Sequence, residues 1–189
     1  MKNQFAQLIQ NNESVHIYYN IDDMRSYLDN LVSYIVSGIE QERHTLVIES
    51  ERLIPLIFKK LEGILTKDQL AYIHTINNFD YYCSSGSFQP AIIFEHLSKH
   101  LDPFYKNNMS FQIWAHVEWG QQEGIVPILE EFENEADTLV TEGGLYLVCA
   151  YDEERVPEAL KLALMKCHPY LILENKITPS NLYVMTDAV

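Results

Sequence analysis

The segment "FQIWAHVEWG" at residues 111–120 carries the side chains best suited to chemistry in this sequence. In an extended chain successive side chains point to opposite faces, so Trp114, His116 and Glu118 share one face. The other face carries Ile113, Ala115, Val117 and Trp119. An imidazole beside a carboxylate suits a general acid–base pair, a ligand contact, or a satisfied polar patch inside a fold.

Metal-binding patterns are missing around these residues. A zinc-deaminase reading of His116-Val-Glu118 needs a P-C-x-x-C partner, which the sequence lacks. There is no H-E-x-x-H, and the three cysteines, Cys83, Cys149 and Cys167, include no C-x-x-C pair. His96 and His100 share a helix face, but such pairs are more often solvated than metal-bound. We therefore predict no metal site, no cofactor and no catalytic residue.

Nucleotide-binding and hydrolase patterns are also missing. The sequence has no G-x-x-x-x-G-K-[ST] loop to surround a triphosphate with backbone N–H groups, and no G-x-S-x-G elbow. No G-x-G-x-x-G follows the first predicted strand. The chain continues there into Asn20-Ile-Asp-Asp23, whose two aspartates would repel a pyrophosphate.

Composition restricts the partners. Asp and Glu outnumber Lys and Arg by 27 to 13, which gives a formal net charge of −14 and disfavours nucleic acid and anionic membranes. No stretch approaches the roughly 18 apolar residues that span a bilayer, and no signal peptide opens the chain. Three widely spaced cysteines fit reduced thiols, so we expect a cytoplasmic protein with one domain over residues 1–189.

Short β-like runs alternate with longer helical ones, which predicts a fold. We expect strands at 14–19, 44–50, 71–75, 111–119, 145–151 and 170–173, and helices at 24–39, 53–65, 91–105, 126–142 and 156–166. Asn20 or Asp22 and Ser50 are expected to cap the first two helices, residues 77–90 to form a loop, and Asp102-Pro103 to break a helix. This order predicts an α/β three-layer sandwich with a mainly parallel central sheet.

In open parallel sheets, ligands bind outside the carboxyl ends of the strands. Nine aromatic and polar residues at or near these ends are our candidate ligand contacts: Tyr18, Tyr19, Glu49, Trp114, His116, Glu118, Trp119, Tyr151 and Asp152. They suit a small molecule with an apolar surface and a hydrogen-bond donor or a cation. The structural alternative is that Asp22, Ser50 and Asp152 cap helices, that Glu118 pairs with a Lys or Arg, and that the tyrosines are core.

Several segments share a pattern with one known family. They are Val15-His-Ile-Tyr-Tyr19 with Gly38-Ile-Glu, Val117-Glu118-Trp119, Leu129-Glu-Glu-Phe-Glu-Asn-Glu135, Leu147-Val-Cys-Ala-Tyr-Asp152, Leu164-Met-Lys-Cys-His-Pro169 and Pro179-Ser-Asn-Leu-Tyr183. Over roughly residues 14–184 the chain resembles the MEDS family, a sensory domain named for methanogens, methylotrophs and the dichloromethane regulator. Where many members carry Arg and Gly before the Glu, this chain has Trp114 and His116.

The resemblance implies a core similar to RecA and the circadian-clock ATPases without their nucleotide loop. It also implies sensing of small molecules, hydrocarbon derivatives being one proposal. Because no output module accompanies the domain, we expect it to act by binding another protein.

Three functions follow as hypotheses. The first is a non-enzymatic regulator that binds a small hydrophobic or aromatic ligand, a signalling protein such as a histidine kinase or transcription regulator, or a second copy in a homodimer. The second is an enzyme that uses His116 and Glu118 as an acid–base pair. The third is an interaction protein that docks through the acidic helix at 126–142.

Overall fold

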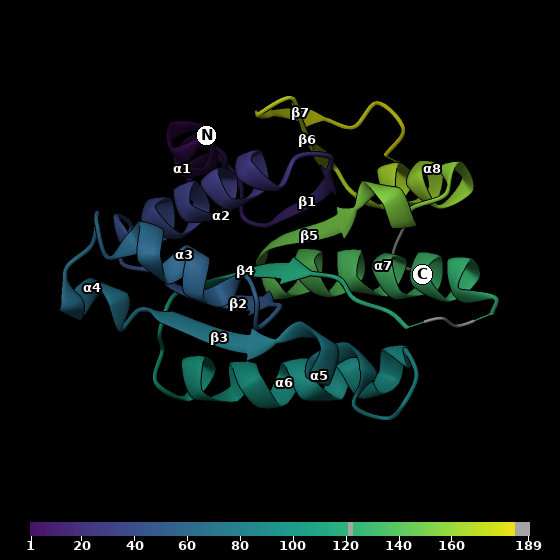
Figure 1. The fold of residues 1–189 in the computed structure, drawn as a ribbon, viewed down its shortest axis with the longest axis horizontal. Helices are drawn as coiled ribbons and strands as arrows, with labels where there is room; N and C mark the ends of the chain where they lie inside the picture. The colour runs from purple at the N-terminus through teal and green to yellow at the C-terminus, as the bar shows by residue number, and fades with distance from the viewer. Residues whose placement is uncertain (121–122, 184–189) are drawn as a thin grey trace.

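The strands form one central sheet in a computed structural model that describes residues 1–120 and 123–183. Within this part of the chain the sheet has seven strands in the order β3-β2-β4-β5-β1-β6-β7 (Figure 1). The strands are β1 (Val15–Ile21), β2 (His44–Glu49), β3 (Ile73–Asn77), β4 (Phe111–His116), β5 (Tyr146–Asp152), β6 (Tyr170–Leu173) and β7 (Lys176–Pro179). Neighbouring strands are parallel except β6 and β7, which are antiparallel. The predicted mainly parallel sheet is confirmed. Val184, the last residue of the predicted resemblance, and the end of the predicted domain at 189 lie outside the described residues.

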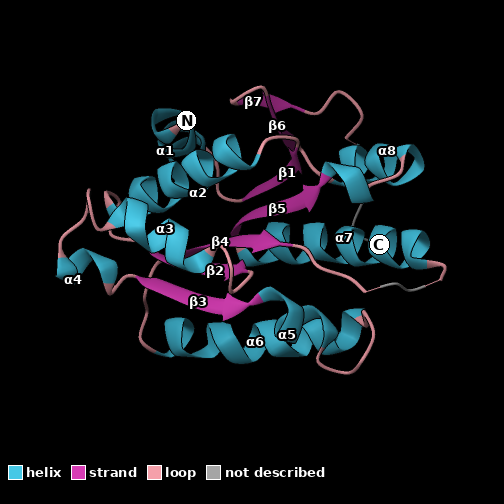
Figure 2. Ribbon diagram, viewed as in Figure 1, coloured by secondary structure: helices cyan, strands magenta, loops and turns pink. Residues whose placement is uncertain are grey.

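Helices cover both faces of the sheet. They are α1 (Lys2–Asn11), α2 (Met24–Ile39), α3 (Ile54–Leu61), α4 (Lys67–Leu70), α5 (Asn78–Cys83), α6 (Pro90–Lys106), α7 (Ile125–Gly143) and α8 (Glu158–Cys167), with a 3-10 turn at Glu153–Arg155. Figure 2 shows the magenta strands as a layer between cyan helices. Apolar side chains of α1, α2 and α3 pack on one face, and those of α5, α6, α7 and α8 on the other. This is the predicted three-layer sandwich.

The strand sequences explain the two cores. In β4, Ile113 and Ala115 join the core under α6 and α7, whereas Trp114 joins the core under α2. All six residues of β4 are buried, as the near-continuous apolar runs of a two-face-covered parallel sheet require. The predicted alternation of faces is therefore confirmed for β4, but the strand ends at His116 and not at Trp119 as predicted, so Glu118 and Trp119 lie in the segment after it.

Several local predictions were wrong. Asp23, rather than Asn20 or Asp22, caps α2 by accepting a hydrogen bond from the Ser26 amide at 2.7 Å. Ser50 makes no side-chain cap, and α3 follows Leu53. The predicted helix break at Asp102-Pro103 is absent, and Pro103 lies inside a continuous α6. Proline disfavours helical geometry in the residue before it, but tertiary packing can override this preference.

Other elements were missed. The predicted loop at 77–90 contains the short helix α5, whose N-terminus is capped by Asn77 accepting from the Asp80 amide at 2.9 Å. Helix α1 and strand β7 were not predicted. The amide side chain of Gln4 links them by accepting a hydrogen bond from Ile177 N at 2.9 Å. Within residues 1–120 and 123–183, no helix combines the length and apolarity that crossing a membrane would need.

Candidate functional site at the carboxyl edge of the sheet

Three polar residues meet where neighbouring strands end. Glu49 ends β2, His116 ends β4 and Asp152 ends β5, and these strands are adjacent in the order β2-β4-β5. Nδ1 of His116 lies 2.9 Å from Oε1 of Glu49, and its Nε2 lies 3.3 Å from Oδ1 of Asp152. Glu49, His116 and Asp152 were three of the nine residues expected at this edge, and the structure places them in contact there.

The two carboxylates determine the charge of His116. Burial disfavours the imidazolium, but the neighbouring Asp152 and Glu49 outweigh it and raise the pKa of His116 to about 10. The same imidazolium lowers the pKa of Asp152 below its ordinary value, against the effect of burial. His116 is therefore a cation held between two anions at neutral pH.

A buried network fixes Glu49 beneath this cation. The Tyr27 hydroxyl of α2 donates to Oε2 of Glu49, and the Ser50 amide donates to Oε1 at 2.6 Å. The indole Nε1 of Trp114 donates to the Tyr27 hydroxyl at 3.0 Å. Burial, followed by the charge of Glu49, raises the pKa of Tyr27 well above its ordinary value, so this phenol stays a donor.

The His116 imidazole borders an open pocket with a cavity volume of about 640 Å³. Its lining combines acidic, amide, basic and apolar side chains: Met24, Ser50, Glu51, Arg52, Leu53, Asn77, Asn78, Phe79, Asp80, His116, Glu118 and Asp152. Met24 and Phe79 are 41% and 57% exposed, which is high for such apolar side chains. Nε2 of His116 has no aligned hydrogen-bond partner among the described residues, although Asp152 lies beside it.

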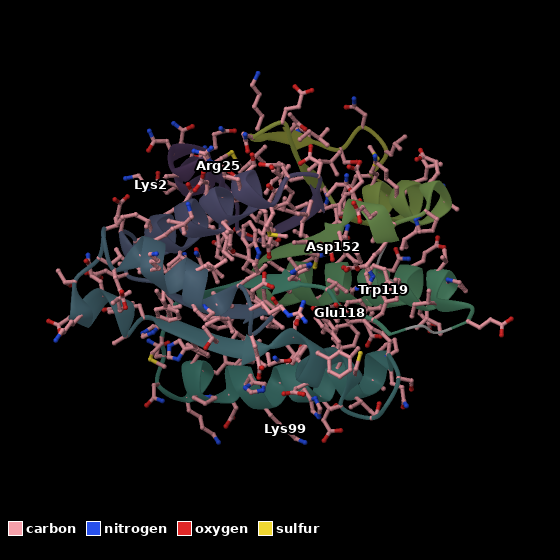
Figure 3. All side chains as sticks on the ribbon, in the orientation of Figure 1. Lys2, Arg25, Lys99, Glu118, Trp119 and Asp152 are labelled. Carbon is pink, nitrogen blue, oxygen red and sulfur yellow. The ribbon has the colours of Figure 1, made fainter. Side chains whose placement is uncertain are left out.

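Glu118 forms an ion pair with Arg155, which lies in the 3-10 turn that follows β5. Nη1 of Arg155 donates to Oε1 of Glu118 at 2.5 Å, and its Nη2 donates to the Trp119 carbonyl. The Arg155 guanidinium also lies over the Trp119 ring, 4.1 Å from the centroid. Figure 3 labels Glu118, Trp119 and Asp152, which gather near the carboxyl ends of β4 and β5. The structural alternative for Glu118, pairing with a Lys or Arg, matches this contact.

The remaining predicted site residues are packed inside the two cores. Tyr18 and Tyr151 face α7 and α8 and lie edge to face, with ring centroids 5.9 Å apart. Tyr19 and Trp114 lie on the opposite face, 5.9 Å apart. Each of these four side chains is at most 3% exposed. The structure therefore does not bring them together with His116 at the pocket surface, although Trp114 supports Tyr27 from below.

Besides Met24, Phe79 and other residues of the pocket lining, the sequence analysis missed three residues that contact its predicted members. Tyr27 binds Glu49, Arg155 binds Glu118, and the buried Asn78 side chain donates to the His116 carbonyl at 3.2 Å. Tyr27 occupies a helical core position, so its sequence pattern indicates packing alone. For Arg155 the signal was present, because it lies three residues after Asp152, the end of β5.

A second polar cluster lies under the opposite layer of helices. Candidate ligand atoms of His16, Glu133, Cys149 and His168 all fall within 4.8 Å of one another. All four side chains are buried. Sequence spacing gave no sign of this cluster, because its members lie on four separate segments of the chain.

Comparison with known proteins identifies the family. A comparison with curated proteins gives no match. The family model described as the "MEthanogen/methylotroph, DcmR Sensory domain" matches residues 15–169, which contain the carboxyl-edge pocket and the buried cluster. The chain therefore belongs to the MEDS family of sensory domains.

Proposed function

We propose that the protein is a non-enzymatic regulator that senses a small molecule in the carboxyl-edge pocket. The observation that carries the proposal is the charged His116, clamped by Glu49 and Asp152 beside two exposed apolar side chains, Met24 and Phe79. A largely preformed pocket with a few convergent polar groups is the usual form of a ligand site. Membership of a sensory-domain family supports the same role.

The lining favours a ligand with an apolar body and a cationic or hydrogen-bond-donating group. Glu51, Asp80, Glu118 and Asp152 supply carboxylates, whereas Arg52 and His116 supply the cations. Phe79 offers an aromatic face for a cation or an apolar ring. An anionic ligand would meet this carboxylate excess and bind less well.

Asp152 connects the pocket to the buried hydrogen-bond network, because it is partly exposed and also contacts His116. Its side chain is 35% exposed, while its Oδ1 lies 3.3 Å from the buried His116. A ligand donor that engages Asp152 competes with His116 for the same carboxylate. Weakening of the His116–Asp152 contact would affect Glu49 and then Tyr27 on α2, because hydrogen bonds join His116 to Glu49 and Glu49 to Tyr27. Met24 at the start of α2 lines the pocket itself. We propose that a signalling protein, such as a histidine kinase or transcription regulator, reads the resulting change in α2.

Two features disfavour catalysis by His116 and Glu118. A general base works best when its pKa lies near the working pH, and the pKa of His116 is raised to about 10. Glu118 is held by Arg155 at 2.5 Å. We also propose that the protein works in the cytoplasm, where its three free cysteines would stay reduced.

The first test is native mass spectrometry of the full chain, purified gently from its own host. A co-purified organic molecule of stoichiometric mass would support the proposal and supply the ligand. That ligand should raise the melting temperature of the wild type, and Phe79→Ser should weaken its binding by about tenfold if one apolar contact is lost. Ile64→Ser is a matched control, because Ile64 is also an exposed apolar residue, at 59%, and does not line the pocket.

The contrary outcomes are equally definite. If the ligand binds wild type and Phe79→Ser with the same affinity, it binds elsewhere, and the assignment of the ligand site to this pocket is wrong. The enzyme hypothesis would be favoured if the wild type turned over a bound molecule and His116→Gln did not, while circular dichroism showed that the variant keeps its fold. A chain that carries no small molecule and shows no thermal shift across a metabolite panel, yet binds a host protein, would favour the interaction hypothesis.

A further inference from the structure

Four side chains from four segments converge under α7, apart from the residues that line the carboxyl-edge pocket. His16 lies on β1 and Cys149 on the adjacent strand β5, and their side chains point toward the same layer of helices as Tyr18 and Tyr151. Glu133 descends from the middle of α7, and His168 directly follows α8. Each of the four is at most 2% exposed.

The donor atoms have the spacing of a coordination sphere. Oε2 of Glu133 lies 3.5 Å from Nε2 of His16 and 3.5 Å from Nε2 of His168. Sγ of Cys149 lies 3.5 Å from the same His16 Nε2. In a tetrahedron with metal–ligand bonds of about 2.0–2.3 Å, neighbouring ligand atoms are separated by roughly 3.3–3.8 Å. The three distances given above fall within this range, and all four donor atoms lie within 4.8 Å of one another.

Hydrogen bonds to the second polar atom of His16, His168 and Glu133 orient these side chains so that their donor atoms point toward one another. Nδ1 of His16 lies 3.1 Å from Oδ1 of Asp137, and Nδ1 of His168 lies 2.7 Å from the Leu164 carbonyl. The Tyr151 hydroxyl donates to Oε1 of Glu133. Metal-bound histidines are usually oriented in this manner, with the second ring nitrogen donating to a carboxylate or backbone carbonyl.

Two of the inward-facing atoms make no aligned hydrogen bond, although they lie 3.5 Å from each other. Oε2 of Glu133 and Nε2 of His168 are buried and have no hydrogen-bond partner among the described residues. The two histidine rings also lie against each other, with centroids 3.9 Å apart and planes tilted by 33°. An unpaired buried carboxylate oxygen costs free energy, and both atoms would be satisfied by one cation between them.

We propose that His16, Glu133, Cys149 and His168 bind one divalent transition-metal ion, with Zn²⁺ the best match. Two imidazoles, a thiolate and a carboxylate are ligands that zinc accepts in tetrahedral sites. On binding, the proton of the Cys149 thiol and any proton on Nε2 of His16 or His168 are released to solvent, and the thiolate and Glu133 carboxylate then balance the two charges of the ion. This proposal is independent of the carboxyl-edge pocket, which shares no lining residue with the cluster.

The closed geometry gives the ion a structural role. Four protein ligands leave no open position for substrate or water, and burial isolates the site from solvent. The ion would join β1, β5 and the segment after α8 to the middle of α7. Binding therefore fixes this acidic helix against the sheet, because Glu133 and Asp137 turn inward from it.

The test uses the full chain, purified without a histidine tag. Metal analysis of the purified protein should find one Zn²⁺ per chain, and removal by a chelator should lower the melting temperature. Addition of Co²⁺ to the metal-free protein should produce the near-ultraviolet thiolate charge-transfer band and the visible bands of a tetrahedral site. Cys149→Ser should abolish the charge-transfer band, and Glu133→Gln should weaken metal affinity by about tenfold or more.

Cys167→Ser is the matched control. Cys167 is also a buried free thiol, but its Sγ lies 3.5 Å from Nδ1 of His168, on the ring edge away from the cluster. This variant should retain one Zn²⁺ per chain and the full Co²⁺ spectrum. A wild-type chain that remains folded, contains no stoichiometric metal and takes up neither Zn²⁺ nor Co²⁺ would overturn the proposal. A thiolate–Co²⁺ band that persists in Cys149→Ser would overturn it as well, even if another variant failed to fold.

Discussion

His116 and Glu49 form a buried ion pair that joins the carboxyl ends of two adjacent parallel strands. Nδ1 of His116 lies 2.9 Å from Oε1 of Glu49, whose side chain is fully buried. Glu49 also accepts hydrogen bonds from Tyr27 and from the Ser50 amide. The carboxylate is thus satisfied by one cation and two neutral donors, and substitution of His116 removes the cation while leaving both neutral donors in place.

Replacement of His116 by Ala should destabilise the protein strongly. The substitution leaves Glu49 buried without its cation, and breaking a buried ion pair in this way costs about 3–5 kcal/mol in other proteins. Urea unfolding followed by circular dichroism measures the change. His100→Ala is the control, because His100 is exposed on α6 and should change stability by less than about 0.5 kcal/mol. Equal effects of the two substitutions would show that the pair contributes little.

Stability should also depend on pH through His116. Its pKa is about 10 in the folded chain and near the ordinary value of 6.5 in the unfolded chain. Because the folded pKa is the higher one, the contribution of His116 is complete below about pH 6.5 and falls as pH rises toward 10. Urea unfolding at intervals from pH 6 to 10 should show this decline for the wild type. The same series on His116→Gln should be flatter, and identical slopes would contradict the assignment.

Sequence periodicity was sufficient to predict the layers of this fold. The apolar run in β2 and the helical spacing in α2 each depend on local physical chemistry, so their boundaries were predicted to within about two residues. The failures have other causes. The sequence at Pro103 indicates a helix end, but α6 continues through it because the helix packs along its length against the sheet. The short edge strand β7 depends on its pairing with β6.

The candidate site was only partly predictable. The rule that strand ends gather at one edge indicated Glu49, His116 and Asp152 correctly as neighbours. It also indicated Tyr151, which points into the opposite core and donates to Glu133. The buried cluster of His16 and Cys149 could not be predicted from spacing, because it requires the knowledge that β1 and β5 are adjacent.

Gly38→Ala should destabilise the protein although alanine favours helices. A Cβ at Gly38 would lie 2.6 Å from Cδ of Gln112, a buried side chain held by hydrogen bonds to the Tyr34 carbonyl and to Thr45. Overpacking of this kind costs about 1–3 kcal/mol, and it should exceed the gain in helix propensity of up to about 1 kcal/mol. Chemical denaturation measures the difference. Gly63→Ala is the control, since its nearest atom, the Lys60 carbonyl oxygen, lies at an ordinary 3.6 Å.

Asp23→Ala should lower stability more than Asp22→Ala. Asp23 caps α2 by accepting from the Ser26 amide at 2.7 Å, a bond that lowers the pKa of the Asp23 carboxyl. Asp22 is its exposed neighbour and does not cap the helix. Loss of a cap in a domain of this size should lower the melting temperature by roughly 2–4 °C. Calorimetry on both variants measures the two melting temperatures. A larger decrease for Asp22→Ala would show that Asp22 caps the helix, as the sequence predicted.

Glu118→Gln should separate stability from ligand binding at the pocket. The Glu118–Arg155 pair is only partly buried, with side-chain exposures of 25% and 34%, so its loss should cost less than about 1 kcal/mol. Arg155 keeps its contacts with the Trp119 carbonyl and ring, which should hold the segment in place. If the pocket binds a cationic or donor ligand, removal of this carboxylate should weaken binding, and the effect should diminish at high salt. Isothermal titration with the co-purified ligand measures it at low and high ionic strength. An unchanged affinity would assign Glu118 to the loop structure alone and leave Glu51, Asp80 and Asp152 as the carboxylates that select the ligand.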